Sequence, residues 1–234
     1  MKALHAPITN RFLGFALKTL REVPTKLVGT AQALFVYYVV PLLWHLDLLL
    51  SGAILVPMGA CVLVFLTQPK FVLQQLFDEE DGNSMKILLG ATILSQMVTV
   101  TEWAYFSKNQ PYYWTIASVL GISLIGAGLL LRVWAIVELG PNFDNRVHIR
   151  KDHELIVTGP YRYIRHGSYT GVYMLAIGIA VYFSAWFSVV FSVIVLGWAY
   201  RYRIVHEEKA LLSYFGDAYR DYMKKTYMLI PFLL

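Results

Sequence analysis

Long apolar runs alternate with shorter polar segments along this sequence of 234 residues. A helix needs about 20 apolar residues to cross about 30 Å of hydrocarbon, because it rises about 1.5 Å per residue. Four runs have the required length and predict membrane-spanning helices. They cover residues 27–44, 48–67, 87–106 and 114–137.

A fifth apolar run, at residues 172–199, is too long for one upright crossing. As a single helix it would extend about 42 Å. We expect it to turn at Ser184, Ala185 and Trp186 and to form a helical hairpin whose two arms return to the same side. The pattern predicts an all-α polytopic membrane protein with four transmembrane helices plus a C-terminal hairpin, which gives five or six membrane segments.

Lysine and arginine are concentrated in residues 1–26, in 138–170 and from Arg201 onward. Loops on the cytosolic side carry such an excess, so we expect both termini and the loop before the hairpin to be cytosolic. The chain then divides into a cytosolic or interfacial segment at 1–26, transmembrane helices at 27–137, and a C-terminal region at 138–234 that contains the hairpin.

Two smaller patterns refine this picture. Before the first run, apolar residues recur at helical spacing among polar ones, which predicts an interfacial helix. These residues are Phe12, Leu13, Ala16, Leu17, Leu20 and Val23. In the fourth run, Ala117, Gly121, Gly126 and Gly128 form a face of small residues that should let another helix approach closely.

Composition and charge exclude several classes of protein. Hydrophobic residues make up 57% of the chain and charged residues 15%, with a mean hydropathy of +0.53. Soluble domains are about 45–50% apolar and about 25% charged, so the chain is not one soluble domain. The lone Cys61 excludes an internal disulfide framework. The net charge of +5 does not indicate nucleic acid, because the basic residues follow the membrane topology. There is no HExxH or CxxC motif, so we expect no bound metal.

Charged and reactive side chains are dense in two polar segments, 139–171 and 201–231. Together they are too short for a separate soluble nucleotide-binding domain. Any site must therefore be shared with the membrane helices. Arg132 lies inside the fourth apolar run, and a charge within a membrane segment is a functional candidate because its burial is costly.

The first polar segment contains GPYRYIRHGSYTG at residues 159–171, and the second contains Arg203, Glu207, Glu208 and the pattern FGxxYxxY at 215–222. These motifs together resemble the isoprenylcysteine carboxyl methyltransferase family. The resemblance implies an enzyme that uses S-adenosylmethionine without a soluble methyltransferase domain. It makes residues 138–234 the catalytic region, with a cytosolic cofactor site built from the loop before the hairpin and the C-terminal tail. It also implies methylation of the C-terminal carboxylate of a prenylated cysteine in CaaX-processed proteins. The expected partners are then a prenylated protein or prenylcysteine and membrane lipid, and a eukaryotic member is expected in the endoplasmic reticulum membrane.

The same resemblance implies roles for individual residues. Arg203 would bind the substrate carboxylate, and Glu208 would help to fix the site, with Glu207 as a third catalytic candidate. The residues implied to line the cofactor pocket are Asn142, Val147, His148, Ile149, Tyr161, Arg165, His166 and Tyr169. The chain departs from the family at Gly167, where the family has proline, and glycine leaves the backbone less restricted at that turn.

The chemistry of carboxyl methylation suits these residues. A carboxylic acid with a pKa of about 4 is already ionised near neutral pH, so no general base is required. The site needs a cation for the carboxylate, exclusion of water and aligned reactants. Arg203, just after the hairpin, is placed to supply the cation. On a regular helix it shares a face with Glu207, whereas Glu208 lies about 140° around the axis.

Three other functions stay open on the sequence. A membrane methyltransferase could act instead on a phospholipid amine, with Glu207 or Glu208 as the partner of the amine, or on a small thiol. Sterol reductases look similar in their C-terminal region but bind a nicotinamide cofactor. A non-catalytic membrane scaffold would retain the fold alone.

Overall fold

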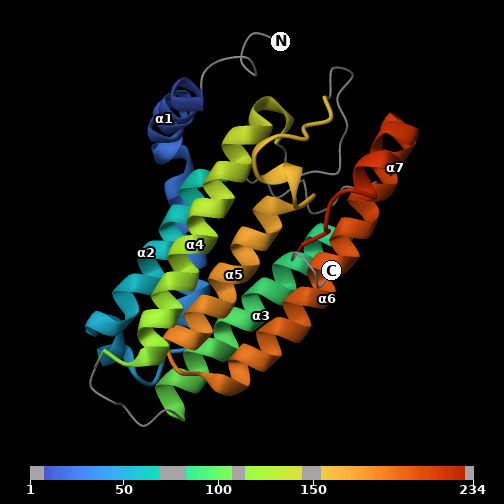
Figure 1. The fold of residues 1–234 in the computed structure, drawn as a ribbon. Coiled ribbons are helices and arrows are strands. Elements are labelled where there is room, and N and C mark those ends of the chain that lie inside the picture. The colour runs from blue at the N-terminus through green and yellow to red at the C-terminus, as the bar shows by residue number, and fades with distance from the viewer. Residues whose placement is uncertain (1–7, 69–82, 107–113, 144–153, 230–234) are drawn as a thin grey trace.

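The computed structural model describes residues 8–68, 83–106, 114–143 and 154–229. Within them the regular structure is helical apart from one isolated bridge, between Ile164 and Tyr227, which confirms the expected all-α class (Figure 1). The α-helices are α1 (Ile8–Leu34), α2 (Gly52–Thr67), α3 (Ser84–Tyr105), α4 (Ile116–Leu139), α5 (Gly167–Tyr182), α6 (Trp186–Phe215) and α7 (Asp217–Met223). Shorter helical turns cover Phe35–Val39, Leu46–Leu50, Gly140–Asn142 and Gly159–Arg162.

Three helical segments of the described residues are long and apolar enough to cross a membrane: Ser84–Tyr105, Ile116–Asn142 and Trp186–Phe215. The apolar helices α2 and α5 are shorter. These lengths support an integral membrane protein, because each long segment exceeds the span of the hydrocarbon core. The full count of four spans plus a hairpin stays a prediction.

Helix α1 buries two polar residues near its C-terminal end, and many of its apolar residues are exposed together with polar ones such as Lys18 and Arg21. Lys26 and Thr30 are buried, and Lys26 Nζ donates to the carbonyl oxygen of Leu66 in the last turn of α2 over 2.7 Å. The exposed side chains of α1 include Ile8, Leu13, Leu17, Leu20, Leu27 and Val28. Exposed leucines and a buried lysine on the same helix suit an outer face that contacts lipid.

The predicted boundary at residue 27, between an interfacial helix and the first span, is not a helix boundary, and the start of the span itself stays a prediction. The helix already begins at Ile8, and helical structure continues to Val39 instead of residue 44. Pro24 lies inside α1 without ending it. Lys26 pairs with Glu22 at 3.1 Å across the proline. One turn later, Thr30 Oγ1 donates to the Lys26 carbonyl over 2.9 Å. The interfacial segment and the first span therefore form one helix.

The predicted hairpin is confirmed, and its second arm is longer than expected. The chain turns between α5 and α6 at Ser184, which has φ +54°. Helix α6 then runs to Phe215 instead of ending near residue 199. Residues 200–215 contain no glycine or proline, and the helix stops only where Gly216 adopts φ +56°. Consequently Arg203, Glu207 and Glu208 lie on the hairpin helix itself, and not on a separate C-terminal tail.

Helices α4 and α5 pack at backbone distance through glycines. A β-carbon on Gly121 would lie 2.5 Å from Tyr182 Cα, and one on Gly128 would lie 2.5 Å from the carbonyl oxygen of Gly171. The small-residue face predicted in α4 is therefore confirmed at these two positions. It is wrong for Gly126, whose β-carbon would meet nothing within 4 Å.

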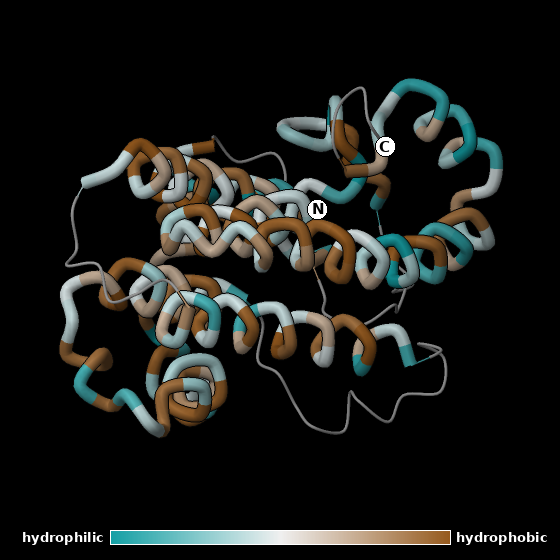
Figure 2. Tube along the Cα trace, turned by 90° about the horizontal axis from the view of Figure 1, so that it is seen from below, coloured by the Kyte–Doolittle hydropathy of each residue, from teal (hydrophilic) through white to brown (hydrophobic). Residues whose placement is uncertain are grey.

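Hydrophilic positions collect at one end of the bundle. Figure 2 shows them in α7 and the neighbouring end of α6, whereas hydrophobic positions recur along the rest of the helices. At this same end α4 finishes, the segment from residue 154 begins, and α5 starts (Figure 1). The candidate site lies here.

Candidate functional site

The two predicted motif segments lie side by side and pair through their backbones. Arg165 N–H donates to the Tyr227 carbonyl over 2.8 Å, and His166 N–H donates to that of Met228 over 3.2 Å. Tyr227 N–H returns a bond of 2.9 Å to the Tyr163 carbonyl. Short parallel pairing of this kind fixes the register of one segment against the other.

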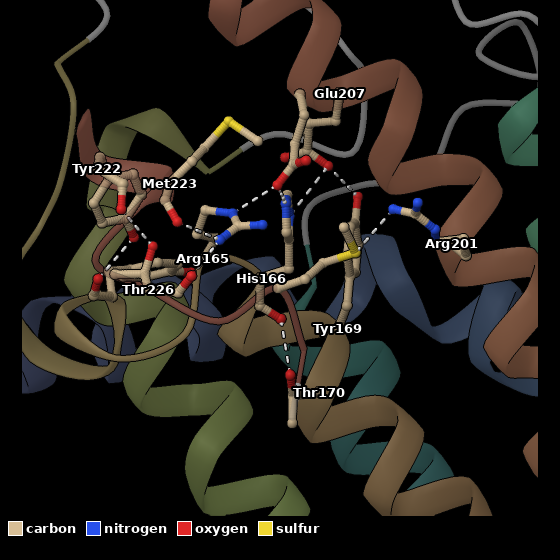
Figure 3. A network of polar contacts seen from close by, with 12 residues as sticks. Arg165, His166, Tyr169, Thr170, Arg201, Glu207, Tyr222, Met223 and Thr226 are labelled. Carbon is tan, nitrogen blue, oxygen red and sulfur yellow. Dashed lines mark hydrogen bonds and ion pairs between the residues drawn. The ribbon is translucent and has the colours of Figure 1, made fainter. Parts of the chain in front are cut away.

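Side chains add to this backbone pairing. Thr170 Oγ1 donates to the Leu229 carbonyl over 2.7 Å, and Tyr222 Oη donates to the Tyr161 carbonyl over 2.7 Å. Arg165 Nη1 donates to the Thr226 carbonyl (Figure 3). Helix α7 and the segment after it therefore hold the loop before α5 and the first turn of α5, between residues 161 and 170.

Glu208 holds two residues of the first motif. Its Oε1 accepts a hydrogen bond from Arg165 Nε over 2.7 Å and lies 3.1 Å from His166 Nε2. Glu208 is 6% exposed and His166 is 4% exposed. A buried carboxylate is stable only when it is paired and hydrogen-bonded, and these contacts supply both requirements.

Tyr169 links Arg203 to Glu207. Tyr169 Oη donates to Glu207 Oε2 over 2.9 Å, and Arg203 Nε lies 3.4 Å from Tyr169 Oη. Arg203 Nη1 also donates to Ser84 Oγ of α3 over 2.8 Å, and the side chain is almost fully buried. The two consecutive glutamates of α6 thus serve neighbouring sets of residues: Glu207 the Tyr169–Arg203 pair, and Glu208 the Arg165–His166 pair.

A cavity of about 190 Å³ lies beside Arg203. Its polar lining includes the guanidinium of Arg132 together with Tyr169, Tyr200 and Ser168. Apolar side chains from three helices (α2, α3 and α5) and from the segment after α4 add to the wall: Val64, Phe65, Leu88, Leu89, Phe143 and Val172. The cavity therefore joins two cations to an apolar surface within the helix bundle.

Three buried polar groups at this end of the molecule lack a partner among the described residues. They are Arg11 Nε, Arg132 Nε and the hydroxyl of Tyr161. Burial raises the pKa of the Tyr161 hydroxyl well above its usual value, so this group is neutral and can donate or accept a hydrogen bond. An unpaired polar group in a buried position indicates a place where a ligand atom can bind.

The structure brings together most of the residues implied to form the site. Arg165, His166 and Tyr169 of the loop and α5 contact Glu207 and Glu208 of α6 (Figure 3). Asn142 lies after α4, in the turn Gly140–Asn142, next to the cavity residue Phe143. Val147, His148 and Ile149 lie outside the described residues.

Two residues of the site were not identified from the sequence. Ser84 bonds Arg203 from the first turn of α3, and Tyr200 lines the cavity one turn before Arg203 on α6. Neither has a local sequence signal, because a lone serine and an aromatic residue at a span end have ordinary structural roles. In the part of the chain that the structure describes, no three His, Cys, Asp or Glu side chains are grouped to hold a metal ion.

Comparison with known sequences confirms the resemblance read from the motifs. The model of the isoprenylcysteine carboxyl methyltransferase (ICMT) family matches residues 119–213. The chain is 30% identical over 149 residues to protein-S-isoprenylcysteine O-methyltransferase of Schizosaccharomyces pombe, covering 63% of this chain and 62% of that protein. It is 33% identical over 136 residues to a probable protein-S-isoprenylcysteine O-methyltransferase of Oryza sativa subsp. indica, covering 57% of this chain and 70% of that protein.

A solved structure shares the fold. It is described as the eukaryotic intramembrane Ras methyltransferase ICMT, and it superposes with a TM-score of 0.57 over 99% of this chain and 97% of its own. The sequence identity to that structure is 21%. The similarity extends beyond the residues that the family model matches, so the N-terminal helices belong to the same architecture.

Proposed function

Because this chain belongs to the isoprenylcysteine carboxyl methyltransferase family, we propose that it methylates the C-terminal carboxylate of a prenylated cysteine in CaaX-processed proteins. We further propose S-adenosylmethionine as the methyl donor. The observation that carries the substrate assignment is the cavity that holds Arg132 and Arg203 against an apolar wall. A prenylcysteine has the matching parts, an anionic carboxylate next to a long hydrocarbon chain.

The two arginines are suited to bind the carboxylate. Both are at least 95% buried, and a guanidinium is a planar donor that matches a carboxylate in two bonds. Arg203 is held in place by Ser84 and by Tyr169, so its orientation does not depend on the substrate. Since preorganised charge costs no reorganisation during the reaction, such a pair favours catalysis as well as binding.

The cofactor site fits the residues on the other side of Tyr169. The unpaired hydroxyl of Tyr161 can bond a polar atom of an adenosyl group, and the partly exposed carboxylate of Glu207 can face a cationic amino acid group. Arg165 and His166 keep the loop in place through Glu208. When bound, S-adenosylmethionine supplies an electrophilic methyl group, which a carboxylate oxygen accepts as the carbon–sulfur bond breaks and S-adenosylhomocysteine leaves.

The protein contributes alignment, charge and exclusion of water. The substrate carboxylate is ionised at neutral pH, so none of these residues is required to remove a proton. The apolar wall excludes water from the reacting oxygen, which strengthens its interaction with the arginines. Glu207 holds the Tyr169 hydroxyl, and that hydroxyl in turn lies against Arg203.

We also propose the position of the protein in the cell. The site end of the bundle would face the cytosol with both termini, since lysine and arginine concentrate in the segments at that end. For a eukaryotic protein the membrane would be that of the endoplasmic reticulum.

A methyl-transfer assay tests the function. The purified chain, supplied with radiolabelled S-adenosylmethionine, should methylate acetyl-farnesylcysteine and leave phosphatidylethanolamine unlabelled. Arg203→Ala should lose most of this turnover, while Arg201→Ala, an exposed arginine on the same helix, should retain it. Methylation of the lipid amine alone would overturn the substrate assignment, and near-normal turnover by Arg203→Ala would overturn the role of Arg203.

A further inference from the structure

Glu138 carries a carboxylate at a position where the fold does not favour one. It lies in the last turn of α4 and is 4% exposed. The carbonyl groups at a helix C-terminus carry partial negative charge and repel an anion. Burial adds a further cost unless the carboxylate is paired. A residue that conflicts with its local surroundings in this way calls for a functional explanation.

The partners of Glu138 come from two distant parts of the chain. Arg11 of α1 donates from Nη2 to Glu138 Oε2, and Thr158 donates from Oγ1 to Glu138 Oε1 over 2.5 Å. The side chain of Arg11 is 13% exposed and that of Glu138 is 6% exposed, so solvent screens this ion pair only weakly. One carboxylate therefore connects the N-terminal helix to the start of the motif loop.

Glu138 also packs against the backbone of that loop. Gly159 has φ +58°, in the left-handed region, and begins the turn Gly159–Arg162. A β-carbon on Gly159 would lie 2.8 Å from Glu138 Cδ and 2.9 Å from Glu138 Cγ. The position of the turn is thus fixed by the glutamate side chain. Two residues later the same turn carries Tyr161, whose buried hydroxyl is unpaired.

We propose that Glu138 is a positioning residue for the cofactor: held by Arg11, it sets the turn that presents Tyr161. This inference rests on the proposed function, and it makes α1 part of the cofactor site. Because the contacts of Glu138 fall on residues 158 and 159, their loss should weaken cofactor binding before it affects the carboxylate pocket around Arg203.

Binding of S-adenosylhomocysteine to the purified full chain, measured by isothermal titration calorimetry, tests this role. Arg11→Gln removes the ion pair with Glu138, Thr158→Val removes the hydrogen bond to it, and both variants leave Glu138 in place. We expect each variant to weaken S-adenosylhomocysteine binding about tenfold and to raise the KM for S-adenosylmethionine similarly, with the KM for acetyl-farnesylcysteine within about twofold. Arg11→Lys keeps the charge and should recover most of the affinity. Lys18→Gln, at an exposed position of the same helix, should bind like the unaltered chain.

Unchanged S-adenosylhomocysteine affinity in both Arg11→Gln and Thr158→Val would overturn the inference, and so would equal increases in both KM values. If Arg11→Gln does not fold, Thr158→Val and Arg11→Lys still decide the question. If the unaltered chain binds no S-adenosylhomocysteine, the proposed function fails instead.

Discussion

Glu208 and Arg165 form a buried ion pair, in which Arg165 Nε donates to Glu208 Oε1 over 2.7 Å and each side chain is 8% exposed. The same oxygen lies 3.1 Å from His166 Nε2. The pair joins α6 to the loop that leads into α5. Its loss should therefore affect both the stability of the protein and the arrangement of this loop.

Glu208→Ala is expected to destabilise the protein by ~3–5 kcal/mol, because it leaves the Arg165 guanidinium buried without its counter-charge. Glu207→Ala is the matched control, since the neighbouring Glu207 side chain is 32% exposed and its removal should cost ~1 kcal/mol or less. Thermal unfolding in detergent, followed by tryptophan fluorescence, measures the difference. Equal melting temperatures for the two variants would show that the Arg165–Glu208 pair does not stabilise the fold.

Arg132→Met should impair substrate binding selectively. The variant removes a guanidinium that lines the cavity and keeps much of the apolar stem, so packing within α4 is largely retained. We expect kcat/KM for acetyl-farnesylcysteine to fall about 100-fold, the usual range for loss of one preorganised charge donor. Binding of S-adenosylhomocysteine should change less than twofold. A parallel loss of cofactor affinity would place Arg132 in the cofactor site instead.

Gly128→Ala should separate α4 from α5. The new β-carbon would lie 2.5 Å from the Gly171 carbonyl, so the two backbones must move apart, and overpacking of this kind costs about 1–3 kcal/mol or more. Gly126→Ala lies on the same helix in open space and should be neutral or slightly stabilising. Thermal unfolding distinguishes them, and a Gly128→Ala variant that melts with the unaltered protein would contradict the packing described above.

The stability of the protein should fall in strongly alkaline solution. Burial raises the pKa of the Tyr161 hydroxyl and that of Tyr222 above their value in the unfolded chain, which is about 10. Below about pH 9 these tyrosines are protonated in both states and stability does not depend on them. Above about pH 10 only the unfolded chain loses their protons, so stability declines as pH rises.

Melting temperatures between pH 8 and pH 11 test this alkaline loss. Tyr161→Phe removes one of the titrating hydroxyl groups, so the melting temperature should fall less steeply with pH. The Tyr161 hydroxyl has no partner in the described structure, so its removal changes little else. Tyr163→Phe removes a tyrosine that is 60% exposed and should leave the slope unchanged. Identical slopes in all three proteins would mean that buried tyrosines do not determine the effect.

Sequence patterns predicted those parts of the fold that membrane thickness imposes. The hairpin turn near Ser184 followed from the length of one apolar run, because a single helix of that length exceeds the hydrocarbon core. The end of α6 at Phe215 was missed, since a helix that passes from apolar to polar surroundings keeps its backbone geometry and changes only its composition. A helix was predicted at residues 12–23, but its continuation through Pro24 into the first apolar run was not.

The candidate site was predictable as a set of residues but not as an arrangement. Arg165, His166 and Glu208 were identified through motif resemblance, whereas their mutual contacts depend on how α6 crosses the loop before α5. Helical periodicity suggested that Arg203 and Glu207 share a face, and the structure links them through Tyr169 of another helix. Ser84 comes from a third helix, and local sequence holds no information about such an approach.

The pairing of residues 163–166 with residues 227–228 also sets an order of events during synthesis. The loop that contains Arg165 leaves the ribosome well before its partner segment is translated. Until residues 227–229 have emerged, the loop lacks these backbone partners and the Thr170 hydroxyl lacks the Leu229 carbonyl. A nascent chain can therefore insert its helices into the bilayer while the candidate site is still incomplete, and residues 227–229 complete that site as the last of its segments to be translated.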